Sequence, residues 1–362
     1  MCYFVNYQTY KNIKRIIFFL ELIIPAAALL FLTAYSFLPQ TFRKEKAVLF
    51  SIKPKETLIQ IVQGLSSRGA IRNPYLFYIV GFISGYSRYI EAGTYFVSLN
   101  ESPAELYHKF ASGDVATASV TIPPGLNIFQ IARVLSKNRV TGGRQFLSEC
   151  FNRKFLLSIG ASGQSAEGFL YPDTYTFKIY SKPDEVIKKM VGEFMFKIKT
   201  LNIKNPIIGY KYLIIASMII KEANGNIPGN MKMISSVIYN RIKRGMPLDI
   251  DSTSIYAHYL IKYRAGGGAD PYNNSTSPHQ GSKVKAVKKM KAYYLRLKGP
   301  YNTYLNYGLP PTPISNPDLR AIKAAMNPSD SSYLYYISTS TGQIIFSRTL
   351  ESQNYNIAKF LK

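Results

Sequence analysis

A long apolar stretch stands near the start of the chain. Residues 16–38 are apolar apart from Glu21 and a few small polar side chains, and three basic residues come directly before them. As a helix this stretch reaches about 34 Å, enough to cross a hydrocarbon core of about 30 Å. The pattern therefore predicts a single-pass transmembrane helix at 16–38, preceded by a short cytoplasmic tail at residues 1–15.

The side of the membrane that holds the rest of the chain follows mainly from length. A cleaved signal peptide is the alternative, but the stretch is long for one and Ala34-Tyr-Ser36 is a poor cleavage site. Basic residues flank the span in nearly equal numbers, so the positive-inside rule barely decides the orientation. We expect the large part, residues 45–362, to face the periplasm or the cell exterior from the cytoplasmic membrane.

Two stretches of the exported part resemble each other at a spacing of 70 residues. Ile52-Lys-Pro54 precedes the apolar pattern at 58–65, and Ile122-Pro-Pro124 precedes the same pattern at 128–135. Each predicts a short strand, a proline turn and an amphipathic helix. The chain thus uses a small strand-helix unit twice, and such units are often binding modules.

The later part mixes helix and strand patterns. Residues 211–223 are almost wholly apolar until Lys221-Glu222, which predicts a buried helix, and 231–243 show the spacing of a second packed helix. Near the C-terminus, 333–337 and 344–346 are typical of strands joined by a turn. The mixture predicts an α+β fold, because the regular strand-helix alternation of a doubly wound sheet is missing.

Charge narrows the partners only slightly. The chain has 45 Lys and Arg against 20 Asp and Glu, a net charge of +25, which would attract nucleic acid, anionic lipid or acidic wall polymers. No nucleic-acid-binding motif is present, so we expect no nucleic-acid partner. The two cysteines, Cys2 and Cys150, fall on opposite sides of the predicted membrane span, and no disulfide framework follows.

The inventory of reactive residues leaves carboxylate chemistry. His108, His258 and His279 lack the spacing that places two metal ligands on one helix face, and nucleotide-binding and serine-nucleophile motifs are missing, so we expect neither metal nor cofactor. Glu222 ends an apolar helix, where burial raises the pKa of a carboxyl and keeps it protonated. Taken alone, a glutamate in this place also fits a structural ion pair with Lys221, Arg241 or Arg244, or a cap on a neighbouring turn.

Several sequence motifs, which follow one another in a set order, favour a catalytic role of Glu222 over a structural one. The motifs are Glu167-Gly-Phe-Leu-Tyr-Pro-Asp-Thr-Tyr175, Ala216-Ser-Met-Ile-Ile-Lys-Glu-Ala223, Val237-Ile-Tyr-Asn-Arg241, Gly245-Met-Pro-Leu248, Asp251-Ser-Thr253, Tyr301-Asn-Thr-Tyr304 and Gly308-Leu-Pro-Pro311. Together they resemble the YceG-like family of endolytic murein transglycosylases over roughly residues 45–362.

The resemblance implies a membrane anchor, a LysM-like subdomain at 45–118 and a mixed α/β catalytic domain at 119–362. It implies cleavage of peptidoglycan between N-acetylmuramic acid and N-acetylglucosamine, leaving a 1,6-anhydromuramyl end, with Glu222 as the catalytic acid and cell-wall synthases as expected protein partners. Asp251 and Asn302 are then expected to position the substrate. Three tyrosines are available to stack on sugar faces or, alternatively, to pack in the core; these are Tyr256, Tyr301 and Tyr304.

The sequence also departs from the family pattern. The family motif usually has two glutamates two residues apart, and Ile220 replaces the first, so Glu222 alone remains. Ser252 stands where a proline is usual, and Thr312 replaces a small residue. Ile344 and Gln353 occupy positions where histidines are usual, which puts an auxiliary role of the C-terminal tail in doubt.

One carboxyl is chemically sufficient for this reaction. An acid can protonate the glycosidic oxygen, and the resulting carboxylate can then take the proton of the C6 hydroxyl as the anhydro ring closes, so no water enters. Two alternatives stay open: a muramidase-type hydrolase that uses Glu222 and Asp251, and a non-catalytic membrane-tethered scaffold that binds peptidoglycan. Residues 283–298, with seven basic residues and none acidic, are either a contact for anionic polymer or lipid or a solvated helix face.

Overall fold

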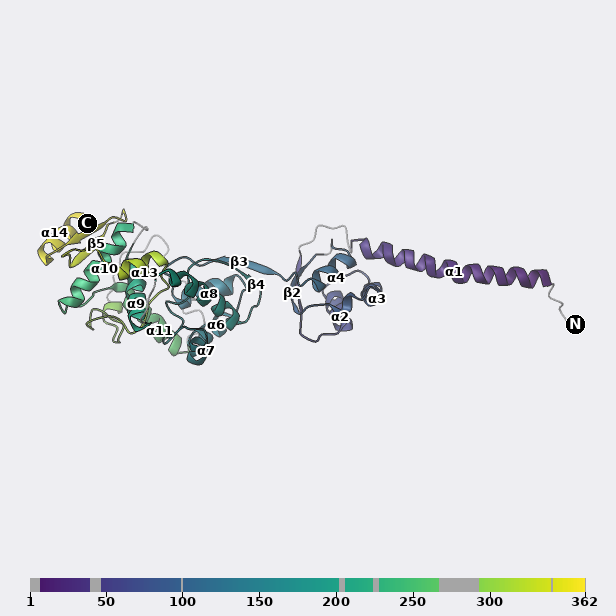
Figure 1. The fold of residues 1–362 in the computed structure, drawn as a ribbon, viewed down its shortest axis with the longest axis horizontal. Helices are drawn as coiled ribbons and strands as arrows, with labels where there is room; N and C mark the ends of the chain where they lie inside the picture. Colours follow the sequence, from purple (N-terminus) through teal and green to yellow (C-terminus); the bar gives the residue numbers. More distant parts are fainter. Residues whose placement is uncertain are drawn as a thin grey trace. The chain divides into compact units, whose positions relative to one another are not determined.

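The computed structural model describes residues 7–39, 47–98, 100–201, 206–223, 228–266, 293–339 and 341–361. The chain divides into two compact units, Met1–Thr117 and Ala118–Lys362. Helices dominate both units, and short two-stranded sheets accompany them, so the predicted α+β class is confirmed (Figure 1).

Helix α1 (Tyr7–Phe37) covers all but the last residue of the predicted span and starts nine residues before it. Its segment Tyr10–Phe37 has a mean hydropathy of 2.5, and its apolar side chains are exposed. Exposed apolar side chains along a helix of this length are favourable in lipid and unfavourable in water. Among the described helices, α1 is the one that is long and apolar enough to cross a membrane.

The rest of the first unit is built around one antiparallel strand pair. Strand β1 (Val48–Ile52) pairs with β2 (Gly93–Val97), and Val48 lies opposite Val97. Between these strands come α2 (Leu58–Ser67), α3 (Pro74–Ile83) and the short 3-10 turn η1 (Tyr86–Arg88), and α4 (Pro103–Ala111) follows them. The helices cover a core of buried side chains, among them Phe50, Leu65, Phe77, Leu106 and Phe110.

Both copies of the strand-helix unit are present. The first is β1 with α2, and the second is β3 (Thr117–Thr121) with α5 (Ile128–Lys137). Each helix begins with a capping box, in which a side chain at the N-cap and a glutamine three residues later hydrogen-bond each other's backbone N–H groups. The similarity at a spacing of 70 residues therefore reflects the same local structure, formed once in each unit.

The second unit continues through α6 (Gly143–Cys150), α7 (Arg153–Ser158), β4 (Thr174–Lys178) and α8 (Pro183–Ile198) to a group of packed helices. In this group α9 (Pro206–Glu222) lies against α10 (Pro228–Lys243), α11 (Asp251–Arg264) and α13 (Leu319–Met326). Four apolar side chains of α9 are almost fully buried; they are Ile215, Ala216, Met218 and Ile219. This confirms the buried helix that the sequence predicts at 211–223.

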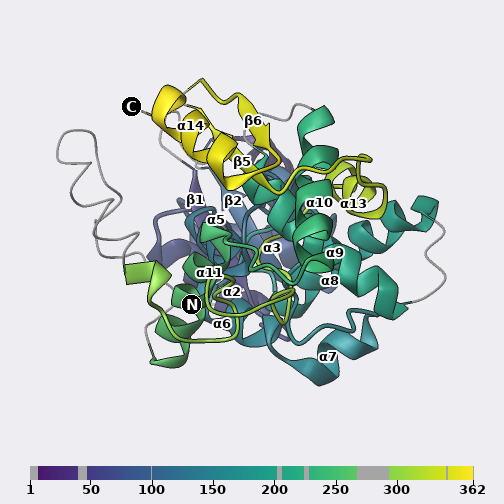
Figure 2. The same ribbon diagram turned by 90° about the vertical axis from the view of Figure 1, so that its left-hand side faces the viewer.

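A small C-terminal layer completes the unit. Strands β5 (Tyr335–Ser338) and β6 (Ile344–Ser347) form an antiparallel hairpin, and α14 (Leu350–Phe360) packs on both strands. Figure 2 shows this layer next to α10, and β5 contacts that helix. The hairpin brings the end of the chain to the group of helices around α9.

Candidate active site

Glu222 is the last residue of α9, so the buried helix ends in a carboxyl group. Two hydroxyl groups donate hydrogen bonds to this half-buried side chain. Ser252 Oγ lies 3.0 Å from Oε1, and the Tyr336 hydroxyl lies 3.2 Å from Oε2. Each carboxyl oxygen therefore has its own neutral donor.

The surroundings of Glu222 raise the pKa of its carboxyl above the ordinary value. Burial is the largest cause, and the nearby negative charge of Asp251 adds to it. The hydrogen bonds from Ser252 and Tyr336 and the positive charge of Lys221 act in the opposite direction without cancelling it. As a result, Glu222 keeps its proton at a higher pH than a solvent-exposed glutamate does.

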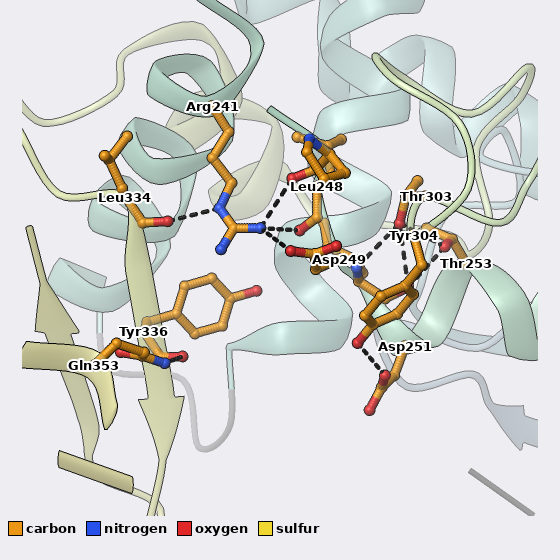
Figure 3. Close-up of polar contacts among 12 residues, drawn as sticks. Arg241, Leu248, Asp249, Asp251, Thr253, Thr303, Tyr304, Leu334, Tyr336 and Gln353 are labelled. Atoms are coloured by element: carbon orange, nitrogen blue, oxygen red, sulfur yellow. Dashed lines mark hydrogen bonds and ion pairs between the residues drawn. The ribbon is translucent and has the colours of Figure 1, made fainter. Parts of the chain in front are cut away.

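Arg241 does not form a structural ion pair with Glu222. The guanidinium group of Arg241 lies 2.8 Å from Asp249 and donates to the backbone carbonyls of Leu248 and Leu334 (Figure 3). The backbone of Asp249 has a φ of 54°, in the left-handed region that costs energy for a residue other than glycine. Arg241 thus holds the loop that leads into α11 and joins it to the start of β5.

Helix α11 begins at Asp251, directly after this loop, and its second residue is Ser252. Thr253 and Thr303, both buried, hydrogen-bond each other across 3.0 Å, which fixes the start of α11 against the segment around Thr303. Because the start of α11 is held on two sides, the hydroxyl of Ser252 has a defined position beside Glu222.

Asp251 and Tyr304 form a second pair of polar groups at the same place. The Tyr304 hydroxyl donates to Asp251 Oδ1 across 2.6 Å (Figure 3). Burial and the hydrogen bond to Asp251 raise the pKa of Tyr304, and the charge of Glu222 contributes to the same shift. The structure therefore brings three of the predicted site residues, Glu222, Asp251 and Tyr304, into one neighbourhood.

The other predicted site residues lie in the interior. Asn302 is fully buried, and its amide donates to the carbonyls of Leu295 and Leu297 while its oxygen accepts from the Tyr304 N–H. Asn302 thus holds the loop that carries Tyr304. Its predicted contact with substrate would need that loop to open, because no polar atom of the amide points outward.

Tyr256 and Tyr301 also pack inward. Tyr256 is 2% exposed, its ring lies between Phe129 and Tyr301, and its hydroxyl hydrogen-bonds Glu167. Tyr301 is half-buried, and its hydroxyl lies 2.8 Å from Thr312. The structure places the Tyr256 ring in the core, where it has no face open to a sugar, because α11 turns this residue toward the interior.

Glu167 is a second buried carboxyl and serves the scaffold. It accepts hydrogen bonds from the Ile128 N–H and the Asn316 amide, and Asn316 in turn accepts from the Gly168 and Leu170 N–H groups. Burial raises the pKa of Glu167 to about 8. Glu167 tethers the Gly-Phe-Leu-Tyr-Pro segment through Asn316.

The side chains that could bind a metal lie apart from one another in the parts of the chain that the structure describes. Within those ranges no group of three or more His, Cys, Asp or Glu side chains converges. His258 packs against the rings of Tyr293 and Tyr294, and burial lowers its pKa. His279 and most of the basic segment at 283–298 lie outside the described residues.

Sequence reasoning missed the two hydroxyl donors to Glu222. The sequence marks Ser252 only as a departure from a usual proline, and it marks Tyr336 only as part of a strand pattern. Ser252 is 30 residues from Glu222 and Tyr336 is 114 residues away, so neither contact has a local signal. The one signal for Tyr336 in the sequence is its place in a predicted strand that is rich in tyrosine, Tyr333-Leu-Tyr-Tyr-Ile337.

The fold and the site together define an α+β protein in which a partly buried glutamate of raised pKa accepts hydrogen bonds from two hydroxyl groups. The model of the YceG-like family matches residues 50–359, and the chain belongs to this family. The motifs that suggested this resemblance lie within the matched residues.

Known proteins of similar sequence agree with this assignment. The chain is 27% identical to the endolytic murein transglycosylase of Bacillus subtilis (strain 168), over 75% of this chain and 73% of that protein. It is 26% identical to the endolytic murein transglycosylase of Streptococcus pneumoniae (strain R6), over 90% of this chain, but it spans only 60% of that protein. A crystal structure of a yceG-like protein from Listeria monocytogenes superimposes with a TM-score of 0.53 at 27% identity, covering 86% of this chain and 98% of the other.

Proposed function

We propose that this protein is a membrane-anchored endolytic peptidoglycan transglycosylase. It cleaves the bond between N-acetylmuramic acid and N-acetylglucosamine and leaves a 1,6-anhydromuramyl end. The observation that carries the proposal is the environment of Glu222: a carboxyl of raised pKa at the end of a buried helix, with one hydroxyl donor on each oxygen.

In this mechanism Glu222 acts first as an acid and then as a base. Its proton passes to the glycosidic oxygen as the bond to the muramyl C1 breaks, and the positive charge on the ring is stabilised in an oxocarbenium-like or acetamido-stabilised form. The Glu222 carboxylate then takes the proton of the C6 hydroxyl as that oxygen bonds to C1. The hydroxyls of Ser252 and Tyr336 stabilise the carboxylate between the two steps, because they donate to the charged form.

Substrate positioning falls to the polar groups that lie near Glu222. Asp251 and Tyr304 are the predicted residues that meet this condition, and a carboxylate and a phenol can both hydrogen-bond sugar hydroxyls. Asn302, Tyr301 and Tyr256 contribute by holding the loops and the helix that carry these groups. This narrows the predicted set of five substrate-binding residues to two that touch sugar.

The first unit supplies the tether. In the proposal α1 is the single-pass anchor, residues 45–118 are a LysM-like subdomain, and the second unit faces the periplasm or cell exterior. Peptidoglycan strands are the substrate, and cell-wall synthases are the expected protein partners. The order strand, helix, helix, strand from β1 to β2 supports a small module of this kind.

Mass analysis of the products tests the chemistry. Peptidoglycan digested by the full chain in detergent should yield muramyl ends lighter by one water than the reducing ends that hydrolysis gives. Glu222→Gln, which keeps the shape of the side chain but cannot donate the proton, should abolish the products. Glu149→Gln is the matched control, because Glu149 is a carboxyl of the same unit that accepts a hydrogen bond from Asn152 on a surface turn.

The other two functions give different results in the same experiment. A muramidase-type hydrolase would give reducing ends and would lose activity in Asp251→Asn as well as in Glu222→Gln. A non-catalytic scaffold would bind peptidoglycan without releasing products. Normal cleavage by Glu222→Gln would remove Glu222 from the mechanism.

A further inference from the structure

The outer face of α3 is apolar although the helix lies on the surface of the first unit. Tyr75 is 81% exposed, Phe82 68% and Ile83 64%, and Ile79 is partly exposed between them. Their spacing of four, three and one residues places all four on one face of the helix. Contiguous exposed apolar side chains on a soluble surface usually mark a contact site.

This face cannot turn inward, because the opposite face of α3 is fixed in the core. The rings of Phe77 and Tyr107 stack at 4.5 Å, and the Tyr107 hydroxyl donates to the Phe77 carbonyl. Gly81 lets Tyr107 approach the helix so closely that a Cβ there would come within 2.3 Å of the tyrosine ring. The helix is therefore apolar on both faces, and only one of them is covered by the protein.

The position of α3 next to α1 indicates what covers the other face. The last turn of α1 contacts α3 (Figure 1). The Tyr35 hydroxyl donates to the carbonyl of Asn73, the N-cap residue of α3. If α1 spans the membrane, its last turn lies at the bilayer surface, and α3 starts at that level.

The composition of α3 fits the interface of a bilayer. The helix contains no charged residue, and two exposed arginines, Arg72 and Arg88, stand beyond its two ends. Tyrosine and phenylalanine are favoured at the level of the lipid headgroups, and arginine is attracted to anionic headgroups. A helix of this kind lies in the plane of the interface with its apolar face in the acyl region.

We propose that Tyr75, Ile79, Phe82 and Ile83 of α3 insert into the outer part of the same bilayer that α1 spans, so that the first unit is held against the membrane at two places. The inference rests on the anchor in the proposed function and goes beyond it. The first unit then has a fixed orientation on the bilayer instead of swinging on the end of α1.

Tryptophan fluorescence can test this contact, because the chain contains no tryptophan. The full chain is reconstituted into phosphatidylethanolamine and phosphatidylglycerol vesicles whose acyl chains carry bromine, a contact quencher. When the bromine lies on the acyl chains near the headgroups, it should quench the tryptophan emission of Tyr75→Trp and of Phe82→Trp. The emission maximum of both variants should lie at a shorter wavelength in vesicles than in water. Tyr355→Trp is the control in the second unit, because Tyr355 is 63% exposed on α14 and should not be quenched.

A reporter in α1 separates this inference from the anchor itself. Leu29→Trp should be quenched most by bromine deep in the acyl chains if α1 spans the bilayer. Quenching at Leu29→Trp without quenching at Phe82→Trp overturns the inference and leaves the anchor. Absence of quenching at all these positions overturns both.

Two further results would assign the face to another occupant. A shift of Phe82→Trp emission on adding soluble glycan strands, without bromine quenching, would make the α3 face a glycan-binding face. A shift in detergent that depends on protein concentration would make the α3 face a contact between two copies of the chain. Replacing Phe82 and Ile83 by serine should abolish quenching at Tyr75→Trp, and persistent quenching would contradict the proposed role of the face.

Discussion

At the scale of single residues, the hydroxyl of Tyr336 controls how Glu222 holds its proton. The hydrogen bond stabilises the carboxylate form, so it lowers the pKa of Glu222 against the effect of burial. In Tyr336→Phe the pKa of Glu222 should rise further. Because the acid step needs the protonated form, the alkaline decline of the cleavage rate should move to higher pH.

The same change should slow the reaction at its optimum. A hydrogen bond to a charged group contributes about 1.5–3 kcal/mol, so we expect a loss of roughly ten-fold or more in the cleavage rate. Tyr335→Phe is the matched control, since the Tyr335 ring lies 5.1 Å from the guanidinium of Arg241 and does not donate to Glu222. A pH–rate profile of Tyr336→Phe that equals that of wild type would show that this hydrogen bond has no part in catalysis.

Residue by residue, the sequence drew attention to Glu222 but not to the groups that surround it. Glu222 could be found because it ends an apolar run and lies within an ordered set of motifs. Its donors could not be found, since β5 and α11 approach it only in the folded chain. Tyr256 is a residue that the sequence offers for sugar stacking and that the structure buries in the core. The presence of an aromatic residue near a motif does not show which side of its helix faces the core.

At the scale of elements, α14 supports the strand that carries Tyr336. The Gln353 amide donates to the Tyr336 carbonyl across 3.0 Å, and its buried oxygen has no hydrogen-bond partner in the described part of the chain. Gln353→Ala should therefore cost about 1 kcal/mol of stability and lower the cleavage rate less than Tyr336→Phe does.

The control for this change is Gln343→Ala, in the exposed turn between β5 and β6. Its melting temperature, Tm, and its cleavage rate should match those of wild type. Equal activity of Gln353→Ala and wild type would mean that β5 keeps Tyr336 in place without α14. The tail would then have no part in the site, as the unusual residues Ile344 and Gln353 first suggested.

The tether formed by Glu167 makes stability depend on pH. The folded-state pKa is raised to about 8, above the ordinary value of 4.5, so the folded state binds more protons between these values. The contribution of Glu167 to the free energy of unfolding is fully present below about pH 4.5 and is lost as the pH rises toward 8. Glu167→Gln stays neutral, and its Tm should change less than that of wild type between pH 5 and pH 8.

Thermal unfolding of both proteins at several pH values checks this prediction. Glu185→Gln, on the solvent side of the first turn of α8, is the control and should keep the pH dependence of wild type. If Tm falls by the same amount in Glu167→Gln and in wild type over this pH range, the pH dependence of stability arises elsewhere.

Elements were easier to predict than their packing. The capping boxes of α2 and α5, the apolar run of α9 and the turn between β5 and β6 are local signals, and the structure contains each of these elements. The contacts of α9 with α13 and of α14 with β5 join segments far apart in the sequence. Periodicity in one segment shows which face is buried but not which segment covers it.

At the scale of the whole molecule, the candidate site and the proposed tether belong to different units. Glu222, Ser252, Asp251, Tyr304 and Tyr336 all lie in the second unit, Ala118–Lys362, which has its own core. A chain that lacks residues 1–46 should therefore cleave purified peptidoglycan with the same products as the full chain and at a rate within about two-fold of it. The two-fold margin corresponds to roughly 0.4 kcal/mol, within the range of changes away from a site.

The same deletion should separate chemistry from location. Alkaline carbonate should extract the shortened chain from the membrane fraction but not the full chain, because α1 supplies the one described segment of spanning length and α3 contacts only the interface. Its cleavage of strands held at the membrane surface should fall much more than its cleavage of purified peptidoglycan, since the substrate is then no longer brought to the enzyme by the tether. If both activities fell together, residues 1–46 would be needed for the chemistry itself, and the assignment of α1 to location alone would be wrong.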